Sequence, residues 1–447
     1  MKNKIILLIL IILLILPVSS NTFANSINEI DLVIISPKDF SNELQPLIQH
    51  KNNHNVKTML KITEEIYQEY DGIDQAEQIK YFIKNAIEQW DARYILLVGG
   101  MKILSFDWFV PVRYSHLDDG FGHKKFLSDL YFADIYDESG EFDDWDSNGN
   151  GILAEWGING DILDLNPDVA IGRLPCRSKN EVKIIVDKII SYENNAFGQK
   201  WFNRMVVVGG DTFQNYQGYE GEETCDIAAD YMDDFDITKL YTSTGSLTSP
   251  NNIINAINQG CGFLMTRGRG GTDRVRMGLP DESEMIAFHN EYISDLLNKG
   301  MYPICVLGEC IHGRFDVGMI NILKLLQNDP EYNLYDCIPE CIAWRLIREK
   351  DAGAIATLTN TNICFGAIGD NNGNNILDDA ELYGGFLAVE IFRLYGQEEI
   401  DILGDLFQNA ISNYVKSLPV HSDKIHCKSV QEFILFGDPS LQIGGYP

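Results

Sequence analysis

The chain has 447 residues and a formal net charge of −30 at pH 7. This charge argues against a nucleic-acid-binding protein, because binding to phosphates requires a basic face. The length allows two or three ordinary domains, or one large unit built from two parts.

The first predicted element is an unbroken apolar run from Ile5 to Leu16, which follows Lys2 and Lys4. Together with the small residues near Ala24, this is the pattern of a secretory signal peptide over residues 1–24. An uncleaved anchor is the alternative, although the run is short for a membrane span. Since no second long apolar segment follows, we expect a secreted or extracytoplasmic protein without a membrane span after signal removal.

Short continuous runs of Val, Ile and Leu then recur along the chain and predict strands that are buried on both faces. These runs are residues 31–36, 94–100, 168–175, 204–211, 261–266, 302–308 and 353–361. Such runs are typical of a parallel sheet that is covered by helices. Between them, Ser178–Glu181 reads as a helix capping box, and Asp74 with Glu77 opens another helix. The alternation predicts an α/β fold.

The order of these elements predicts two sheets, separated by the polar link Glu193–Trp201. The first part would comprise residues 25–198, and the second part residues 199–447.

Two loops rich in Asp, Asn and Gly have the ligand spacing of a calcium loop, in which alternate oxygen atoms surround one hard cation. In residues 144–155 the candidate ligands are Asp144, Asp146, Asn148 and Glu155, and an offset register that begins at Asp146 adds Asn150. In residues 370–381 they are Asp370, Asn372, Asn374, Asp378 and Glu381. There Asn375 stands where the motif has glycine. We expect structural Ca²⁺; the alternative is two solvated Asn/Gly turns.

The stretch LGECIHGRF, residues 307–315, places Cys310 two positions before His312 at the end of a predicted strand. A thiol beside an imidazole is the minimum for cysteine nucleophilic catalysis. A cysteine after a buried strand is usually a small core residue. However, the carboxyl end of a parallel strand is where open α/β sheets place their chemistry. Neither a P-loop nor a G-x-S-x-G motif occurs, so those two classes are excluded.

Three segments resemble the gingipain family of cysteine peptidases: SDLYFADI (128–135), PDVAIGRLPCRSKNEV (167–182) and LFGDPSLQI (435–443). The resemblance implies a catalytic unit of two caspase-like subdomains, each with a mainly parallel sheet flanked by helices. It also implies a cysteine endopeptidase that hydrolyses peptide or protein substrates. The oligomeric state and the preferred side chain at the cleaved bond are not predicted.

The family resemblance implies that Cys310 is the nucleophile, and that the backbone amides of Gly270 and Cys310 are the oxyanion donors. Where the family has the histidine of a Gly-His-Gly turn, this chain has Arg269. Arginine stays protonated and cannot accept a proton from a thiol. Asp168 matches the family's acidic position near that histidine, where it would pair with Arg269.

Three hypotheses follow for the missing base. His312 would take its place, because side chains two residues apart in an extended segment share a side. Alternatively, Arg269 would hold Cys310 as a thiolate, because a nearby cation lowers the pKa of a thiol. In the third, the site is inactive and the fold serves as a binding protein. The four arginines at 267, 269, 274 and 276 would form either a cationic pocket for carboxylates or a solvated turn.

Overall fold

The computed structural model describes residues 29–121, 124–214, 216, 218–328 and 336–447. The predicted signal peptide, residues 1–24, lies outside these ranges. Among the helices of the described residues, none combines the length and the apolar character that crossing a membrane requires.

The first half of the chain contains four strands of the main sheet and the helices that cover them. Its strands are β1 (Leu32–Ser36), β2 (Thr58–Ile62), β3 (Tyr94–Val98) and β6 (Ala170–Leu174), with a hairpin of β4 (Tyr114–His116) and β5 (Lys125–Leu127). Its helices are η1 (Lys38–Phe40), α1 (Ser41–Asn53), α2 (Thr63–Glu69), α3 (Gln75–Trp90), η2 (Asp129–Phe132) and α4 (Lys179–Asn195). As predicted, α3 and α4 begin at Asp74 and Ser178, whose side chains accept hydrogen bonds from the amides of Glu77 and Glu181.

The second half supplies the remaining strands of the main sheet and a small antiparallel sheet above it. The main strands are β7 (Arg204–Gly209), β8 (Asp236–Tyr241), β9 (Phe263–Arg267), β13 (Ile304–Leu307), β14 (Ala356–Asn360) and β15 (Phe433–Phe436). The small sheet consists of β10 (Arg269–Gly271), β11 (Arg274–Gly278) and β12 (Glu284–His289). The helices are α5 (Glu220–Asp230), α6 (Pro250–Asn258), η3 (Asn290–Asp295), η4 (Met319–Asn321), α7 (Ile322–Leu326), α8 (Ile342–Arg348), α9 (Asp378–Glu381), α10 (Tyr383–Glu398), α11 (Leu403–Ser417) and α12 (Lys424–Glu432).

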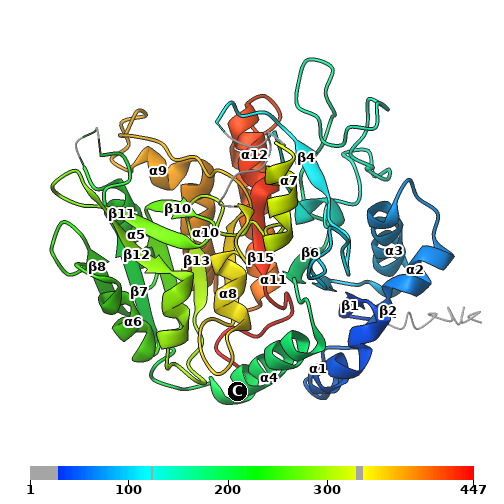
Figure 1. The fold of residues 1–447 in the computed structure, drawn as a ribbon, viewed down its shortest axis with the longest axis horizontal. Helices are drawn as coiled ribbons and strands as arrows, with labels where there is room; N and C mark the ends of the chain where they lie inside the picture. The colour runs from blue at the N-terminus through cyan, green and yellow to red at the C-terminus, as the bar shows by residue number, and fades with distance from the viewer. Residues whose placement is uncertain (1–28, 122–123, 215, 217, 329–335) are drawn as a thin grey trace, which may run out of the picture.

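The strands of both halves form one ten-stranded sheet in the order β2-β1-β3-β6-β15-β14-β13-β9-β7-β8. The predicted α/β class and the mainly parallel arrangement within each half are confirmed. The prediction of two separate sheets is wrong, because β15 lies between the halves and joins them (Figure 1). β15 is parallel to β6 but antiparallel to β14. The strands of the two halves therefore run in opposite directions.

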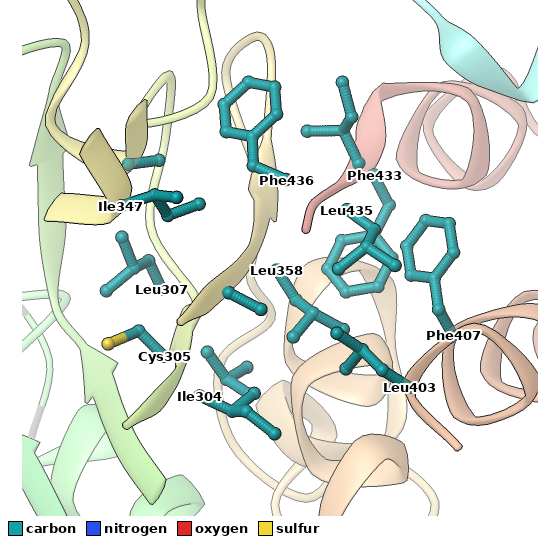
Figure 2. Close-up of a cluster of buried hydrophobic side chains, with 14 of the residues drawn as sticks. Ile304, Cys305, Leu307, Ile347, Leu358, Leu403, Phe407, Phe433, Leu435 and Phe436 are labelled. Atoms are coloured by element: carbon teal, nitrogen blue, oxygen red, sulfur yellow. The ribbon is translucent and has the colours of Figure 1, made fainter. Parts of the chain in front are cut away.

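Apolar side chains on both faces hold β15 in place. Figure 2 shows Phe433 and Leu435 of β15 beside Phe407 of α11, and all three are buried. On the opposite face, the ring of Phe436 packs edge to face against that of Phe315, with 5.4 Å between ring centroids. Burial of such large side chains on both faces contributes several kcal/mol to the join between the halves.

The three segments that carry the family resemblance meet next to this join. The buried guanidinium of Arg173 donates to both carboxylate oxygens of Asp129, at 2.6 and 2.8 Å. A Cβ atom on Gly172 would lie 2.4 Å from the carbonyl oxygen of Gly437, so only glycine fits there. Their sequence similarity therefore reflects the packing between the two halves of the sheet.

Candidate active site

Cys310 lies in the loop that leaves the carboxyl end of β13, as predicted. The residue is partly exposed, and its thiol donates a hydrogen bond to the carbonyl oxygen of Cys364, at 3.2 Å. Cys364 follows β14, the neighbouring strand, at the same edge of the sheet. Desolvation raises the pKa of the Cys310 thiol, although the hydrogen bond to Cys364 opposes that shift. The resting thiol therefore needs additional help to ionise.

The backbones of Gly270 and Cys310 are in direct contact. A Cβ atom on Gly270 would lie 2.1 Å from the carbonyl oxygen and 2.7 Å from the amide nitrogen of Cys310. A side chain at position 270 is therefore impossible without a backbone shift. The structure thus brings together the two residues whose amides the family resemblance assigns to the oxyanion.

The imidazole of His312 is directed away from the role expected of a base. It is fully buried, and its Nε2 lies 2.9 Å from the carbonyl oxygen of Arg274. Its Nδ1 lies 3.4 Å from the carboxylate of Glu309. The expected extended conformation is wrong, because Ile311 has φ of 54°, in the left-handed region. A turn at Ile311 removes the reason for expecting the imidazole and the thiol on the same side.

Each of the four arginines near the site is paired with a carboxylate. Arg269 and Arg276 share Glu284, at 2.6 and 3.1 Å, on the small antiparallel sheet. Arg274 pairs with Asp273 at 2.6 Å, and the buried Arg267 pairs with Asp379. The structure therefore does not support an open cationic pocket. Arg269 forms its ion pair with Glu284, and half of its side chain is exposed.

Asp168 has a structural role in the first half of the chain. Its carboxylate accepts hydrogen bonds from the amides of Ile135 and Tyr136, at 2.7 and 2.9 Å. The predicted pairing of Asp168 with Arg269 is wrong, because Arg269 pairs with a carboxylate of its own sheet.

Burial raises the pKa of Asp211, which follows β7, and the charge of Arg269 opposes this shift. The sequence VVVGGD could have indicated Asp211 as a residue near the site, since it places an acid at the end of a buried strand.

Arg267 connects the active-site loop to the second Asp/Asn-rich loop, a link that sequence reasoning missed. Its Nε donates to the carboxylate of Asp379, at 2.8 Å, and its Nη1 donates to the carbonyl oxygen of Gly308. The same carboxylate accepts from the hydroxyl of Thr224, at 2.8 Å. The segment before Cys310 is therefore held by a buried ion pair that begins in α9.

The two Asp/Asn-rich loops have the same internal hydrogen bonds, which fixes how they correspond. In the first loop, Asp146 accepts from the amides of Asn150 and Gly151, at 3.0 Å in each case. In the second, Asp370 accepts from the amides of Asn374 and Asn375, at 3.1 and 2.8 Å. The first loop thus adopts the offset register that begins at Asp146.

This register changes the expected ligand set of the first loop. Asp144 lies outside it and accepts from the amide of Asp146 at 2.9 Å. Asp161, which was not predicted, accepts from the amides of Asn148 and Glu155 at 3.1 and 2.8 Å. At the end of each loop a glutamate accepts from an asparagine amide, Glu155 from Asn150 at 2.7 Å and Glu381 from Asn374 at 2.8 Å.

The second loop also fits the predicted spacing at its last positions. Asp378 accepts from the amide of Asn371 at 3.0 Å, and Asn372 donates to Glu381 at 2.9 Å. Asn375 adopts φ of 67°, the conformation that glycine usually supplies. In the described ranges, no cluster of three or more His, Cys, Asp or Glu side chains is arranged around a common point. Any cation would therefore depend on Asn and backbone oxygens as well as on carboxylates.

A parallel α/β sheet with a cysteine after one strand and a glycine turn after its neighbour defines a cysteine-peptidase type of site. The model of Peptidase family C25 matches residues 25–444, and the chain belongs to this family. Gingipain R2 of Porphyromonas gingivalis is 23% identical over 337 residues, which are 74% of this chain and 36% of that protein. The chain thus spans about a third of the length of this relative.

Solved structures agree with the fold. The crystal structure of the Arg-specific cysteine proteinase gingipain R has a TM-score of 0.65 at 19% identity, covering 94% of this chain and 79% of that one. The complex of the pro- and mature domains of a Porphyromonas gingivalis gingipain gives a TM-score of 0.62 at 20% identity, covering 92% and 79%. At these identities the structures establish the caspase-like fold alone.

Proposed function

We propose that this protein is an exported cysteine endopeptidase whose nucleophile is Cys310. The thiolate attacks the carbonyl carbon of a peptide bond, an S–C bond forms, and the C–N bond breaks as the amine leaves with a proton. Water then hydrolyses the thioester and regenerates the thiol. The observation that carries the proposal is the contact between the backbones of Gly270 and Cys310, a cysteine that is itself partly exposed.

The same proposal includes structural Ca²⁺ in both Asp/Asn-rich loops. In the first, Asp146, Asn148, Asn150, Glu155 and Asp161 would hold the ion. In the second it would be Asp370, Asn372, Asn374, Asp378 and Glu381. The matching hydrogen bonds of the two loops support this assignment, because the side-chain oxygens already turn inward. An ion in the second loop would also order Asp379 and hence the segment before Cys310.

Export is proposed from the N-terminal sequence, where a basic start, an apolar run and small residues succeed one another. Mature protein isolated from the producing cell should begin near Asn25 and fractionate outside the cytoplasm. Recovery only from membranes with Met1 intact would instead identify an anchor.

A thiol-reactive probe tests the central proposal. Reduced, calcium-loaded protein is treated with a haloacetamide or a peptidyl ketone, and the labelled cysteine is identified by mass spectrometry. In parallel the protein is incubated with a mixed peptide library. We expect selective labelling at Cys310 and cleavage that the substitution Cys310→Ala abolishes. If Cys310 is not labelled and no peptide is cleaved, the proposal is wrong, and the protein is a binding protein with a peptidase fold.

A further inference from the structure

A buried cluster of one lysine and two carboxylates lies beside the candidate nucleophile. Lys428 of α12 is fully buried and forms an ion pair with Glu432, one helical turn further on. Its Nζ also lies 3.6 Å from a carboxylate oxygen of Asp119, which is likewise buried. Removing three charges from water costs several kcal/mol for each ion.

The reversed direction of β15 brings this cluster to Cys310. Glu432 immediately precedes β15, so it lies at the edge of the sheet where β13 and β14 end. The amide of Thr361 donates to the carbonyl oxygen of Glu432 at 2.9 Å, and the amide of Ile311 donates to that of Asn362 at 2.8 Å. Hydrogen bonds thus continue from the active-site loop through the end of β14 to Glu432. The backbone of Glu432 thus lies two strand spacings, about 10 Å, from the backbone of the active-site loop.

The side chains of Lys428 and Cys310 both reach the loop that follows β14. Lys428 donates to the carbonyl oxygen of Ile363, and Cys310 donates to that of the next residue, Cys364. The ammonium and the thiol therefore bind consecutive carbonyl groups of one loop. The ring of Phe365, in the same loop, packs against the ammonium of Lys428, with 5.4 Å between Nζ and the ring centroid.

The cluster acts on the thiol through its charges. Apart from desolvation, Glu432 raises the pKa of Cys310, whereas Lys428 and Arg267 lower it. The carboxylate of Glu309, the residue before Cys310, accepts from Thr266 at 2.7 Å and faces His312. Because Asp379 neutralises the charge of Arg267, the pKa of Cys310 depends mainly on the opposing charges of Lys428 and Glu432.

Both carboxylates of this cluster have a buried oxygen with room for a proton. Oε1 of Glu432 and Oδ2 of Asp119 have no hydrogen-bond partner among the described residues, and Glu432 is the one that lies next to β15. Burial raises the pKa of Glu432 to about 7, although Lys428 opposes the shift. With Glu432 ionised, the cluster has a formal charge of −1, and a proton on Oε1 makes it neutral.

We infer that Lys428 and Glu432 are positioning residues that set the ionisation of Cys310, with Glu432 holding the proton that the thiol releases. The S–H bond breaks, its electron pair stays on sulfur, and an O–H bond forms on Glu432. Thiol and cluster together have a charge of −1 before and after this exchange. The exchange therefore creates no additional buried charge. Arg269 cannot accept the proton in this way, because its guanidinium stays protonated. The relevance of this inference to catalysis rests on the proposed function.

The test measures the pH dependence of alkylation at Cys310. Full-length reduced protein is treated with iodoacetamide between pH 5 and 10, and the Cys310 peptide is quantified by mass spectrometry. Glu432→Gln keeps the shape and an acceptor for Lys428 but removes the negative charge. We expect its alkylation midpoint to move about one unit to lower pH, which is a tenfold gain in rate at a fixed pH below the midpoint. Lys428→Met should move the midpoint in the opposite direction.

A matched control lies far along the chain from Cys310. Glu193→Gln alters another buried carboxylate that is paired with a buried lysine, Lys51, and it should leave the midpoint unchanged. If Glu432→Gln leaves the midpoint where it is, or if Glu193→Gln shifts it equally, the inference is wrong. Should Lys428→Met fail to fold, Glu432→Gln still decides. In peptide cleavage, Glu432→Gln should lower kcat on the order of a hundredfold at unchanged KM. A shifted midpoint in a protein that cleaves no peptide would refute the proposed function but support this inference.

Discussion

Two buried clusters in this molecule each contain a lysine, a glutamate and an aspartate, but the pKa of the glutamate is lowered in one and raised in the other. One consists of Lys51, Glu193 and Asp438, and ties α1 and α4 to the segment after β15. The other consists of Lys428, Glu432 and Asp119, beside Cys310. Both lysines are fully buried, and each faces two carboxylates.

The clusters differ in how completely the central glutamate is satisfied. Burial alone would raise the pKa of Glu193, but Lys51 and His50 bring it below the ordinary value. Its carboxylate binds Lys51 at 2.7 Å, His50 at 2.9 Å and the amide of Gln442 at 3.0 Å. Glu432 has the ammonium of Lys428 and a buried oxygen without a partner in the described chain. The charge of Lys51 together with hydrogen bonds from His50, Lys51 and Gln442 therefore outweighs the burial of Glu193, whereas only Lys428 opposes the burial of Glu432.

The largest expected effect on stability comes from removing Lys51, the cation of the cluster with Glu193 and Asp438. Lys51→Met leaves Glu193 and Asp438 buried together, and should lower the free energy of unfolding by about 3 to 5 kcal/mol. Urea or thermal unfolding followed by circular dichroism measures this. Lys57→Met, which breaks an exposed pair with Glu29, is the control and should cost less than about 1 kcal/mol. A similar small cost for both variants would remove the distinction between the clusters.

The next effect concerns pH. Because the folded pKa of Glu432 is about 7 and its ordinary value is 4.5, the folded protein binds more protons at this group between those values. The free energy of unfolding should therefore fall as pH rises through this window, by roughly 3 kcal/mol from this group. Glu432→Gln should remove that fall when urea midpoints at pH 5 and pH 7.5 are compared with the wild type.

Glu193 should show the opposite sign. Its lowered pKa stabilises the protein above the ordinary value of 4.5, and this contribution is lost as pH falls through the lower folded value. Glu193→Gln should therefore cost stability at pH 7 and much less in acid. The same pH trend in both glutamine variants would contradict the comparison.

Removal of calcium should change the stability of the protein without altering the ion pairs of the two lysine clusters. If the Asp/Asn-rich loops bind the ion, chelation should lower the free energy of unfolding by about 2 to 3 kcal/mol for each occupied loop when calcium had been present at a hundredfold its Kd. Scanning calorimetry of metal-loaded protein before and after chelation measures this. Asp146→Ala with Asp370→Ala should abolish the response. An unchanged melting curve would reduce both loops to turns.

The smallest effect is expected at Asp119, which is the more distant carboxylate from Lys428. The charge of Asp119 adds to the burial that raises the pKa of Glu432, so Asp119→Asn should lower that pKa. The expected change is a fraction of a unit, in the alkylation profile of Cys310 and in the pH at which stability falls. A shift as large as that of Glu432→Gln would show that Asp119 holds the proton.

The sequence was sufficient to predict the α/β class, because each of the predicted runs at β1, β3, β6, β7, β9, β13 and β14 contains consecutive apolar residues. It was insufficient for the join, since β15 is only four residues long and pairs with strands far from it in sequence. Long-range pairing leaves no local pattern.

Parts of the site were hidden for other physical reasons. The sequence placed Cys310 at the end of a predicted strand, and Gly270 was assigned through the family resemblance. Lys428 could not, since a lysine in the helix KIHCKSVQE reads as a solvated side chain. The direction of His312 depends on one left-handed residue, Ile311, and an isoleucine rarely adopts that conformation.

The position of β15 also has a consequence for synthesis. It is made after all the other described strands of the sheet, yet it stands between the two halves. Lys51 likewise reaches its carbonyl partner Ser440 only when a segment 389 positions later has emerged. Contacts that distant form slowly, so a growing chain holds two unclosed halves for most of its translation. Such a chain would still be able to thread through a narrow translocation channel as an extended polymer.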